Sequence, residues 1–128
     1  MDNDKQLLLT KNPNIIFTGY VNDEEIPTLY KNALLYVFPS EYEGFGIPII
    51  EAQYSQVPIL CSNIEVFREV AGNGAEYCEL NSNKFAEKIE YLINTPERMN
   101  ELTKNGSQNV QRFLISTIGK QLMEVIDK

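Results

Sequence analysis

The run VFPSEYEGFGIPIIEAQYSQV, residues 37–57, joins the end of a strand to the start of a helix through a turn that contains two glycines. Residues 34–38, LLYVF, form a continuous apolar, β-prone run, which is typical of a strand buried on both faces. Gly44 and Gly46 lie in the turn, where the backbone can come close to a ligand. Pro48 suits the first helical position, because its missing N–H is not needed there. The run therefore predicts a strand, a tight turn and a helix in succession.

The chemistry of this turn follows from its geometry. A helix N-terminus offers free N–H groups and a partial positive charge, which suit a phosphate. Glu43 precedes the turn, and Glu51 follows about one turn into the helix. A carboxylate only accepts hydrogen bonds, so it suits sugar hydroxyls, which donate them. An anion site with two acceptors for hydroxyls predicts a phosphorylated sugar or a nucleotide sugar as the ligand.

Strands and helices are expected to alternate along the whole chain. Residues 14–19, NIIFTG, predict a first strand. The remaining expected elements are strands at 34–38, 57–61 and 75–78 and helices at 23–32, 48–54, 65–71, 84–94, from 95 onward, and 109–126. This alternation predicts a parallel sheet with right-handed crossovers, whose ligands bind beyond the carboxyl ends of the strands. The glycine turn follows such a strand end, so the expected fold and the expected chemistry agree.

Two of these helices carry specific expectations. In the helix at 23–32, Ile26, Leu29, Tyr30 and Ala33 make a stripe that we expect to be buried. Pro27 must lie within the first turn of that helix, so the helix can start later than its acidic residues suggest. The helix at 84–94 is expected to be capped by the hydroxyl of Ser82.

Composition bounds the class of protein. At 128 residues the chain is expected to be a single domain, residues 1–128, and its 43 % hydrophobic content is typical of a globular protein. The net charge of −7 argues against a nucleic-acid or anionic-membrane partner. Met1 is followed by DNDK, which is unlike a secretory signal, and no apolar run approaches the length of a membrane span.

Cysteine and histidine usage narrows the chemistry further. Cys61 and Cys78 lie near predicted strands and are expected to be reduced core thiols rather than a disulfide. The chain has no histidine, so histidine catalysis within it is excluded and a zinc site is not expected. The sequence predicts no resident metal.

Residues 43–51, EGFGIPIIE, resemble the E-x7-E motif of retaining glycosyltransferases of the GT-B fold, of the large family 4 type. Similar stretches surround this motif in the family's order. NIIFTGYVNDEEI and LYKNALLYVFPS precede it, and EAQYSQVPILCS and EVFREVAGNGAEYC follow it. The likeness runs from residue 14 to residue 78 and continues weakly to the C-terminus. It implies an α/β, Rossmann-like parallel sheet flanked by helices, which corresponds to part of the C-terminal, donor-binding domain of a GT-B enzyme.

The resemblance assigns expected roles to residues at three places. Before the turn, Glu43 resembles the residue close to the donor sugar and phosphate and is the expected catalytic residue. The turn and helix start would contact the donor sugar and diphosphate through the backbone, and the helix would bind the nucleotide ribose. A segment near residue 20 would surround the nucleotide base. The expected donor-binding residues are Gly44, Phe45, Gly46, Ile47, Glu51, Gly19, Tyr20 and Val21.

The resemblance also implies an activity. Enzymes of this family move a hexose from a nucleotide-diphosphate sugar to a hydroxyl, often on a bacterial surface polysaccharide or a lipid-linked glycan. The nucleotide sugar is their substrate, and no metal is required. The resemblance further implies a cytoplasmic location, with the full-length enzyme peripheral at the inner face of the membrane. The overall sequence of the motif run most resembles that of members which transfer mannose or glucose.

The resemblance covers only the later part of the donor domain. Neither the acceptor domain nor the first two donor-domain strands, which bring an arginine and a lysine to the diphosphate, have a counterpart in the chain. A missing N-terminal acceptor domain or a partner chain is therefore expected. In the family's strand order, 3-2-1-4-5-6, the strand at 14–19 would lack its neighbour. It is then expected to pair directly with the strand at 34–38, to pair with a second copy in a homodimer, or to be poorly ordered.

One departure from the family pattern carries a backbone expectation. The family usually shows small residues and a glycine after the motif helix, where this chain has Tyr54, Ser55 and Gln56. Gln56 is therefore expected to adopt a backbone conformation that is awkward for a residue other than glycine.

Two alternatives from other classes stay open. The chain can be a non-catalytic nucleotide-sugar-binding fragment or subunit that needs a partner domain, which the missing strands favour. It can also be an α/β interaction domain of the receiver or flavodoxin type. The second alternative is disfavoured, because receivers need an acidic cluster at the end of their first strand and none is placed so here.

Overall fold

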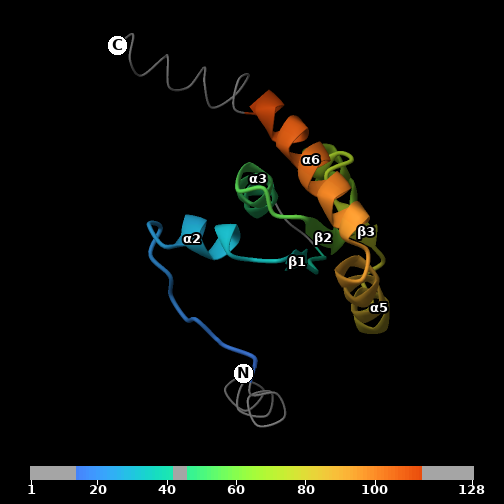
Figure 1. The fold of residues 1–128 in the computed structure, drawn as a ribbon, viewed down its shortest axis with the longest axis horizontal. Coiled ribbons are helices and arrows are strands. Elements are labelled where there is room, and N and C mark those ends of the chain that lie inside the picture. The colour runs from blue at the N-terminus through green and yellow to red at the C-terminus, as the bar shows by residue number, and fades with distance from the viewer. Residues whose placement is uncertain (1–13, 42–45, 114–128) are drawn as a thin grey trace.

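The computed structural model describes residues 14–41 and 46–113, and this part of the chain is an α/β structure (Figure 1). Helices and strands alternate through most of it, as the sequence predicts. In chain order the elements are α2 (Ile26–Lys31), β1 (Tyr36–Phe38), α3 (Ile47–Tyr54), β2 (Ile59–Ser62), α4 (Glu65–Ala71), β3 (Glu76–Cys78), α5 (Ser82–Ile93) and α6 (Pro96–Phe113).

The three described strands form one parallel sheet in the order β1-β2-β3. In this register Tyr36 pairs with Ile59, and Leu60 pairs with Glu76. β2 is the central strand and all its residues are buried, in keeping with its mostly apolar sequence. The predicted Rossmann-like parallel sheet flanked by helices is therefore confirmed. β1 is half-buried and Leu34 is 66 % exposed, so the prediction of a strand buried on both faces at residues 34–38 is wrong.

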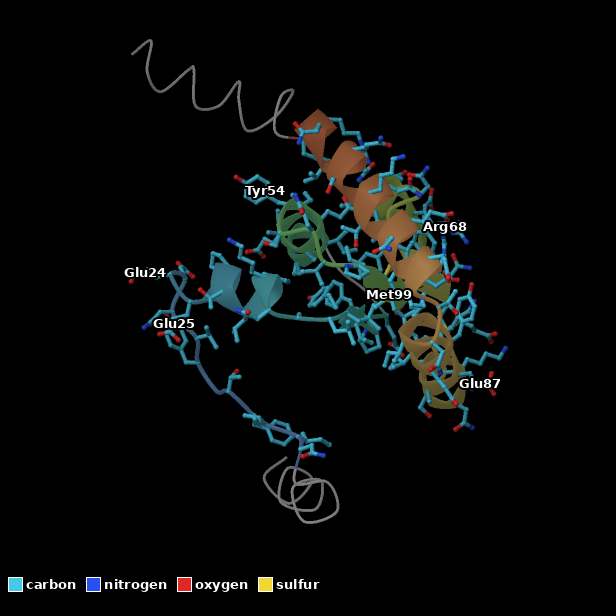
Figure 2. All side chains as sticks on the ribbon, viewed as in Figure 1. Glu24, Glu25, Tyr54, Arg68, Glu87 and Met99 are labelled. Carbon is cyan, nitrogen blue, oxygen red and sulfur yellow. The ribbon has the colours of Figure 1, made fainter. Side chains whose placement is uncertain are left out.

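Two apolar clusters cover the two faces of the sheet. On one face, Ile49 of α3 and Phe67 of α4 pack with Val110 near the end of α6. On the other face, Phe85 of α5 packs with Leu102 nearer the start of α6. α6 therefore takes part in both cores, and Figure 1 shows it running from beside α5 to beside α3. Figure 2 places Met99, which is buried in the second cluster, where α6 leaves α5.

Local chemistry explains most helix boundaries. Pro27 lies in the first turn of α2, so the helix begins later than its acidic residues suggest, as expected. α4 begins and ends where the sequence predicts and is followed by Gly72, which has a positive φ of 59°. The predicted cap of α5 is wrong by one residue. Asn81, not Ser82, is the cap, because its side-chain oxygen accepts a hydrogen bond from the backbone N–H of Lys84 at 3.0 Å.

The predicted strand at residues 14–19 is not present in the structure. Ile16 is 81 % exposed and Phe17 is 42 % exposed, so the apolar run is not buried by the part of the chain that the structure describes. A strand needs a neighbour to satisfy its backbone, and β1 pairs with β2 alone among the described strands. Direct pairing with β1 is therefore wrong as a prediction, whereas pairing with a second copy stays a prediction.

The prediction that the apolar stripe of α2 is buried is also wrong. Every residue of α2, all of which are described, is half-buried or exposed, and Leu29 is 49 % exposed. Among the described helices α2 packs mainly against α3, and Figure 1 shows α3 between α2 and α6. Glu24 and Glu25 project from the turn before α2 on the side away from the sheet (Figure 2). The apolar stripe of α2 is therefore not part of the described core.

The C-terminal part of the described chain is simpler than expected. A single helix, α6, replaces the predicted helix start at residue 95 and the separate helix from residue 109, because Leu102, Gly106 and Val110 continue one buried face. The rest of the predicted last helix lies outside the described residues. Cys61 and Cys78 are buried and free, which confirms them as reduced core thiols. None of the described helices combines the length and apolar character that a bilayer span requires.

Candidate functional site

The start of α3 is an open helix N-terminus. Gly46, the cap residue, has φ 80° and ψ 34°, a left-handed conformation that favours glycine. Its carbonyl accepts hydrogen bonds from the N–H groups of Ile49 and Ile50 at 3.0 and 3.3 Å, and no side chain of the described residues caps the helix. A Cβ at residue 46 would lie 3.4 Å from Cγ1 of Val70, an ordinary van der Waals contact, so the left-handed backbone and not crowding is what favours glycine there. Pro48 has no N–H, so in the first turn of α3 the N–H of Ile47 is the donor left without a partner among the described residues, and it can face an anion at the positive end of the helix.

The residues predicted around this helix start are only partly described. Glu43, Gly44 and Phe45 lie outside the described residues, and their roles stay predictions. Ile47, the first residue of α3, is 53 % exposed, so about half of its side chain is not packed against the described residues. Gly46 is buried at the predicted turn.

A cleft of about 330 Å³ lies between α2 and α3, beside Glu51. Its lining combines one carboxylate with the apolar stripe of α2 and two residues from the segments that flank α2. The lining residues are Val21, Ile26, Leu29, Tyr30, Ala33, Tyr36 and Glu51. Among these described lining residues, Glu51 alone carries a charge. The cleft can therefore accept hydrogen bonds from hydroxyls and cover an apolar ring, but its lining has no positive group for a diphosphate.

Burial and the charge of Glu51 both affect the pKa of Tyr30, which also lines this cleft. Burial raises the pKa of the Tyr30 phenol, and the negative charge of Glu51 raises it further. The Tyr30 hydroxyl lies 3.5 Å from the carbonyl oxygen of Pro48, in the first turn of α3. The neutral phenol of Tyr30 is therefore favoured next to Glu51, where it can donate a hydrogen bond.

The structure separates the segment predicted to surround the nucleotide base. Val21 is half-buried and lines the cleft together with Glu51. Tyr20 is 89 % exposed, and Gly19 has φ 66° with nothing near its missing Cβ. Val21 and Glu51, which are far apart in the sequence, are therefore brought together, whereas Gly19 and Tyr20 do not line the cleft.

The carboxyl ends of β1 and β2 are tied to each other below this site. The backbone N–H of Ser40 donates to Oγ of the fully buried Ser62 at 2.8 Å. This bond fixes the chain where it leaves β1, just before the residues that the structure does not describe.

Sequence reasoning missed two features of the site. The residues of the α2 stripe were predicted to be core, and the structure places them around the cleft. The sequence signal for these residues is the apolar stripe itself, which the helical spacing shows. The second feature is the amide of Gln53, which is 1 % exposed on the far side of α3. A polar residue within an otherwise apolar helix face was its sequence signal.

Comparison with known protein families gives one match over most of the chain. The family described as "Glycosyl transferases group 1" matches residues 4–109.

Two curated relatives are similar to different extents. The O-antigen chain mannosyltransferase B of Escherichia coli is 51 % identical over 59 residues, which is 46 % of this chain and 16 % of the relative. The capsular polysaccharide biosynthesis glycosyltransferase CapM of Staphylococcus aureus is 34 % identical over 121 residues, which is 92 % of this chain and 31 % of the relative. The chain thus spans less than a third of the length of either relative.

Two solved structures share the fold. The C-terminal domain of the glycosyl transferase group 1 family protein LpcC from Francisella tularensis superposes with a TM-score of 0.73 at 26 % identity, over 87 % of this chain and 62 % of that one. Anabaena HepE, solved in complex with UDP, superposes with a TM-score of 0.80 at 22 % identity. That match covers 98 % of this chain and 36 % of HepE.

Proposed function

The chain belongs to the glycosyl transferases group 1 family and has a GT-B-type fold, and from that premise we propose that it binds the nucleotide-diphosphate sugar donor for hexosyl transfer. The relatives named above act in O-antigen and capsule synthesis, which supports a role in making a bacterial surface polysaccharide or a glycolipid. The mannosyltransferase among them supports mannose as the first sugar to test.

One observation carries this proposal. A single short helix, α3, offers the N–H of Ile47 and the positive end of its dipole at its start and a carboxylate, Glu51, about one turn later. Glu51 lies at the edge of an apolar cleft that also contains Val21. In our proposal the start of α3 binds phosphate through the Ile47 N–H and the helix dipole, Glu51 accepts hydrogen bonds from the ribose hydroxyls, and the cleft covers part of the nucleoside.

The proposed reaction is hexosyl transfer with retention and without a metal. The sugar–phosphate bond breaks, the electron pair leaves with the diphosphate, and the acceptor oxygen forms the new bond to the sugar while it loses its proton. The positive end of α3 and positive side chains would stabilise the charge that develops on the diphosphate. Glu43 would position the sugar, and Gly44, Phe45 and Gly46 would contribute backbone contacts.

A second candidate is a nucleotide-sugar-binding subunit that is inactive without a partner. Three observations favour it. The chain spans 16 % and 31 % of the two curated relatives, and no positive group lines the described part of the cleft. β1 also has β2 as its single described neighbour, although its sequence is apolar on both faces. Under this candidate an acceptor domain, in the same polypeptide or in a partner chain, completes the site.

Isothermal titration calorimetry with UDP, GDP and ADP tests the proposal on the chain as it stands. UDP is included because it is bound in the HepE structure. Glu51→Ala should weaken binding of the preferred nucleotide by about 10- to 100-fold, which corresponds to the loss of hydrogen bonds to a charged group. Glu65→Ala removes an exposed carboxylate from the first turn of α4 and should leave binding unchanged.

Two results would decide against the proposal. Equal binding by wild type and Glu51→Ala would remove Glu51 from the site. Failure of wild type to bind any of the three nucleotides would refute donor binding by this chain alone. If the wild-type chain binds a nucleotide, incubation of the nucleotide sugar with hydroxyl acceptors then separates the two candidates, because only the enzyme releases the nucleotide diphosphate.

A further inference from the structure

The motif helix α3 carries a buried amide that the proposed donor site does not use. The Gln53 side chain is 1 % exposed, and each of its polar atoms has a partner. Its Nε2 donates to the carbonyl oxygens of Ala71 at 3.0 Å and Gly74 at 3.4 Å, and its Oε1 accepts from Nδ2 of Asn109 at 2.8 Å. A buried amide is costly unless its hydrogen bonds are made, so this position of α3 is strongly specified.

The partners of Gln53 come from three separate parts of the fold. Ala71 ends α4, Gly74 lies in the turn before β3, and Asn109 belongs to α6. Nδ2 of Asn109 also donates to the carbonyl oxygen of Val70 at 2.7 Å. The Gln53–Asn109 pair therefore joins the motif helix to both α4 and α6.

Glycine makes room for this amide on two sides. A Cβ at Gly74 would lie 2.6 Å from Nε2 of Gln53 and 2.6 Å from Cα of Gly106. A Cβ at Gly106 would lie 3.1 Å from Cγ of Gln53. The space around the amide is thus shaped by residues without side chains, which favours one placement of Gln53.

The apolar residues of α3 cannot by themselves define how the helix is rotated about its axis. Its sequence, IPIIEAQY, is apolar around most of its circumference, and burial of apolar surface is not directional. Hydrogen bonds are directional, and a buried polar network can select one arrangement among several of similar apolar burial. The amide of Gln53 supplies such a constraint.

Gln53 and Glu51 lie on opposite sides of α3. Two residues along an α-helix correspond to a rotation of about 200°. Gln53 faces α4 and α6, and Glu51 faces the cleft beside α2. Any rotation that frees Gln53 from its partners therefore also turns Glu51 away from its present direction.

We propose that Gln53 and Asn109 are positioning residues that fix the rotation of α3 and so hold Glu51 toward the cleft, raising nucleotide affinity without touching the nucleotide. This inference rests on the proposed donor-binding function for its effect on affinity. Its structural part, the fixed rotation of α3, stands on the hydrogen bonds alone.

The test uses Gln53→Met, which keeps the length and volume of the side chain and removes its hydrogen bonds. Calorimetry with UDP, GDP and ADP should show nucleotide affinity lowered by about tenfold at a temperature where the variant is folded by circular dichroism. Asn109→Ala should have an effect in the same direction, and the double variant should lose less than the product of the two single effects. Gln111→Met, the same change at an exposed position of α6, is the matched control and should bind like wild type.

A second readout does not depend on any nucleotide. Amide hydrogen exchange should be at least about tenfold faster across α3 in Gln53→Met, while α5 exchanges as in wild type. Faster exchange spread evenly over all elements would overturn the proposal, because it would mean a general loss of stability. Unchanged exchange in α3 would also overturn it.

The two readouts keep the inference separate from the proposed function. If wild type binds no nucleotide, the proposed function fails for this chain, and exchange alone decides whether Gln53 fixes α3. If wild type binds and Gln53→Met binds equally well although α3 exchanges faster, Gln53 does not position Glu51, and the inference is refuted while donor binding stands.

Discussion

Replacing Gly74 by alanine should destabilise the fold, because it pushes α6 away from the turn that contains residue 74. The added Cβ would meet Nε2 of Gln53 at 2.6 Å and the Cα and N atoms of Gly106 at 2.6 and 2.8 Å. Real Cβ atoms essentially never approach other heavy atoms below 3.0 Å, so something must move. Two of the three atoms belong to the backbone of α6, which cannot change rotamer. The relief must therefore come from a shift of α6 against the turn that contains residue 74.

Two effects set the size of the expected loss. Overpacking by one methyl group in a well-packed region costs about 1–3 kcal/mol. Displacing Nε2 of Gln53 weakens its bonds to Ala71 and Gly74, and a buried group left unpaired costs about 1–3 kcal/mol. We expect the free energy of unfolding to fall by about 3 kcal/mol. With a urea m-value of about 2 kcal/mol per molar, the unfolding midpoint falls by about 1.5 M.

Urea unfolding followed by circular dichroism measures this directly. Gly19→Ala is the matched control, because residue 19 has nothing within 4 Å of the missing Cβ and its φ of 66° alone penalises alanine, by about 1 kcal/mol. A midpoint for Gly74→Ala within error of wild type would refute the close packing of α3, α6 and the turn. A loss no larger than that of Gly19→Ala would show that Gly106 yields easily.

Three further predictions concern the pH dependence, a thiol and the backbone. Burial raises the pKa of Glu76, but hydrogen bonds and charges from Arg98 and Lys88 outweigh it, so the folded-state pKa is lowered. The ionised Glu76 therefore stabilises the folded chain fully above pH 4.5, its ordinary pKa, and this stabilisation is lost as the pH falls through the lower folded-state pKa. Below pH 4.5 the urea midpoint should fall more steeply with decreasing pH for wild type than for Glu76→Gln. Burial raises the pKa of Cys61 to about 12, so a thiol reagent at pH 8 should modify it in urea and spare it in the folded chain. Gln56 has a φ of 62°, and Gln56→Gly should raise the unfolding free energy by about 0.5–1 kcal/mol in the same denaturation assay.

Much of the fold follows from local sequence signals. The LLYVF and VPILC runs predict parallel strands because a continuous apolar run suits a sheet covered on both faces, and of these two strands β2 alone is fully buried. Pro48 and Pro96 mark helix starts because proline suits the first turn. The unusual backbone of Gln56 was also predictable, because this chain has no glycine where the family pattern expects one. These features depend on a few neighbouring residues, so no long-range information was needed.

The strand expected at residues 14–19 shows where such signals fail. Its apolar run has the composition of a strand, but strand structure requires a neighbour to pair with the backbone. No described strand lies beside it, and Ile16 remains 81 % exposed. The same reason explains why the stripe on α2 is not buried. Pairing and burial are decided by what lies next to a segment, and the segment itself does not contain that information.

The sequence by itself determined the parallel α/β class, the helix start after Gly46 and the presence of Glu51 about one turn into that helix, because these depend on residue spacing along the chain. Only the tertiary structure decided that Val21 and Glu51 share a cleft and that Gln53 meets Asn109 of α6. Both contacts join residues that are distant in the sequence. Their geometry depends on how α3 packs between α2 and α6, which is set by side-chain fit and directional hydrogen bonds across elements.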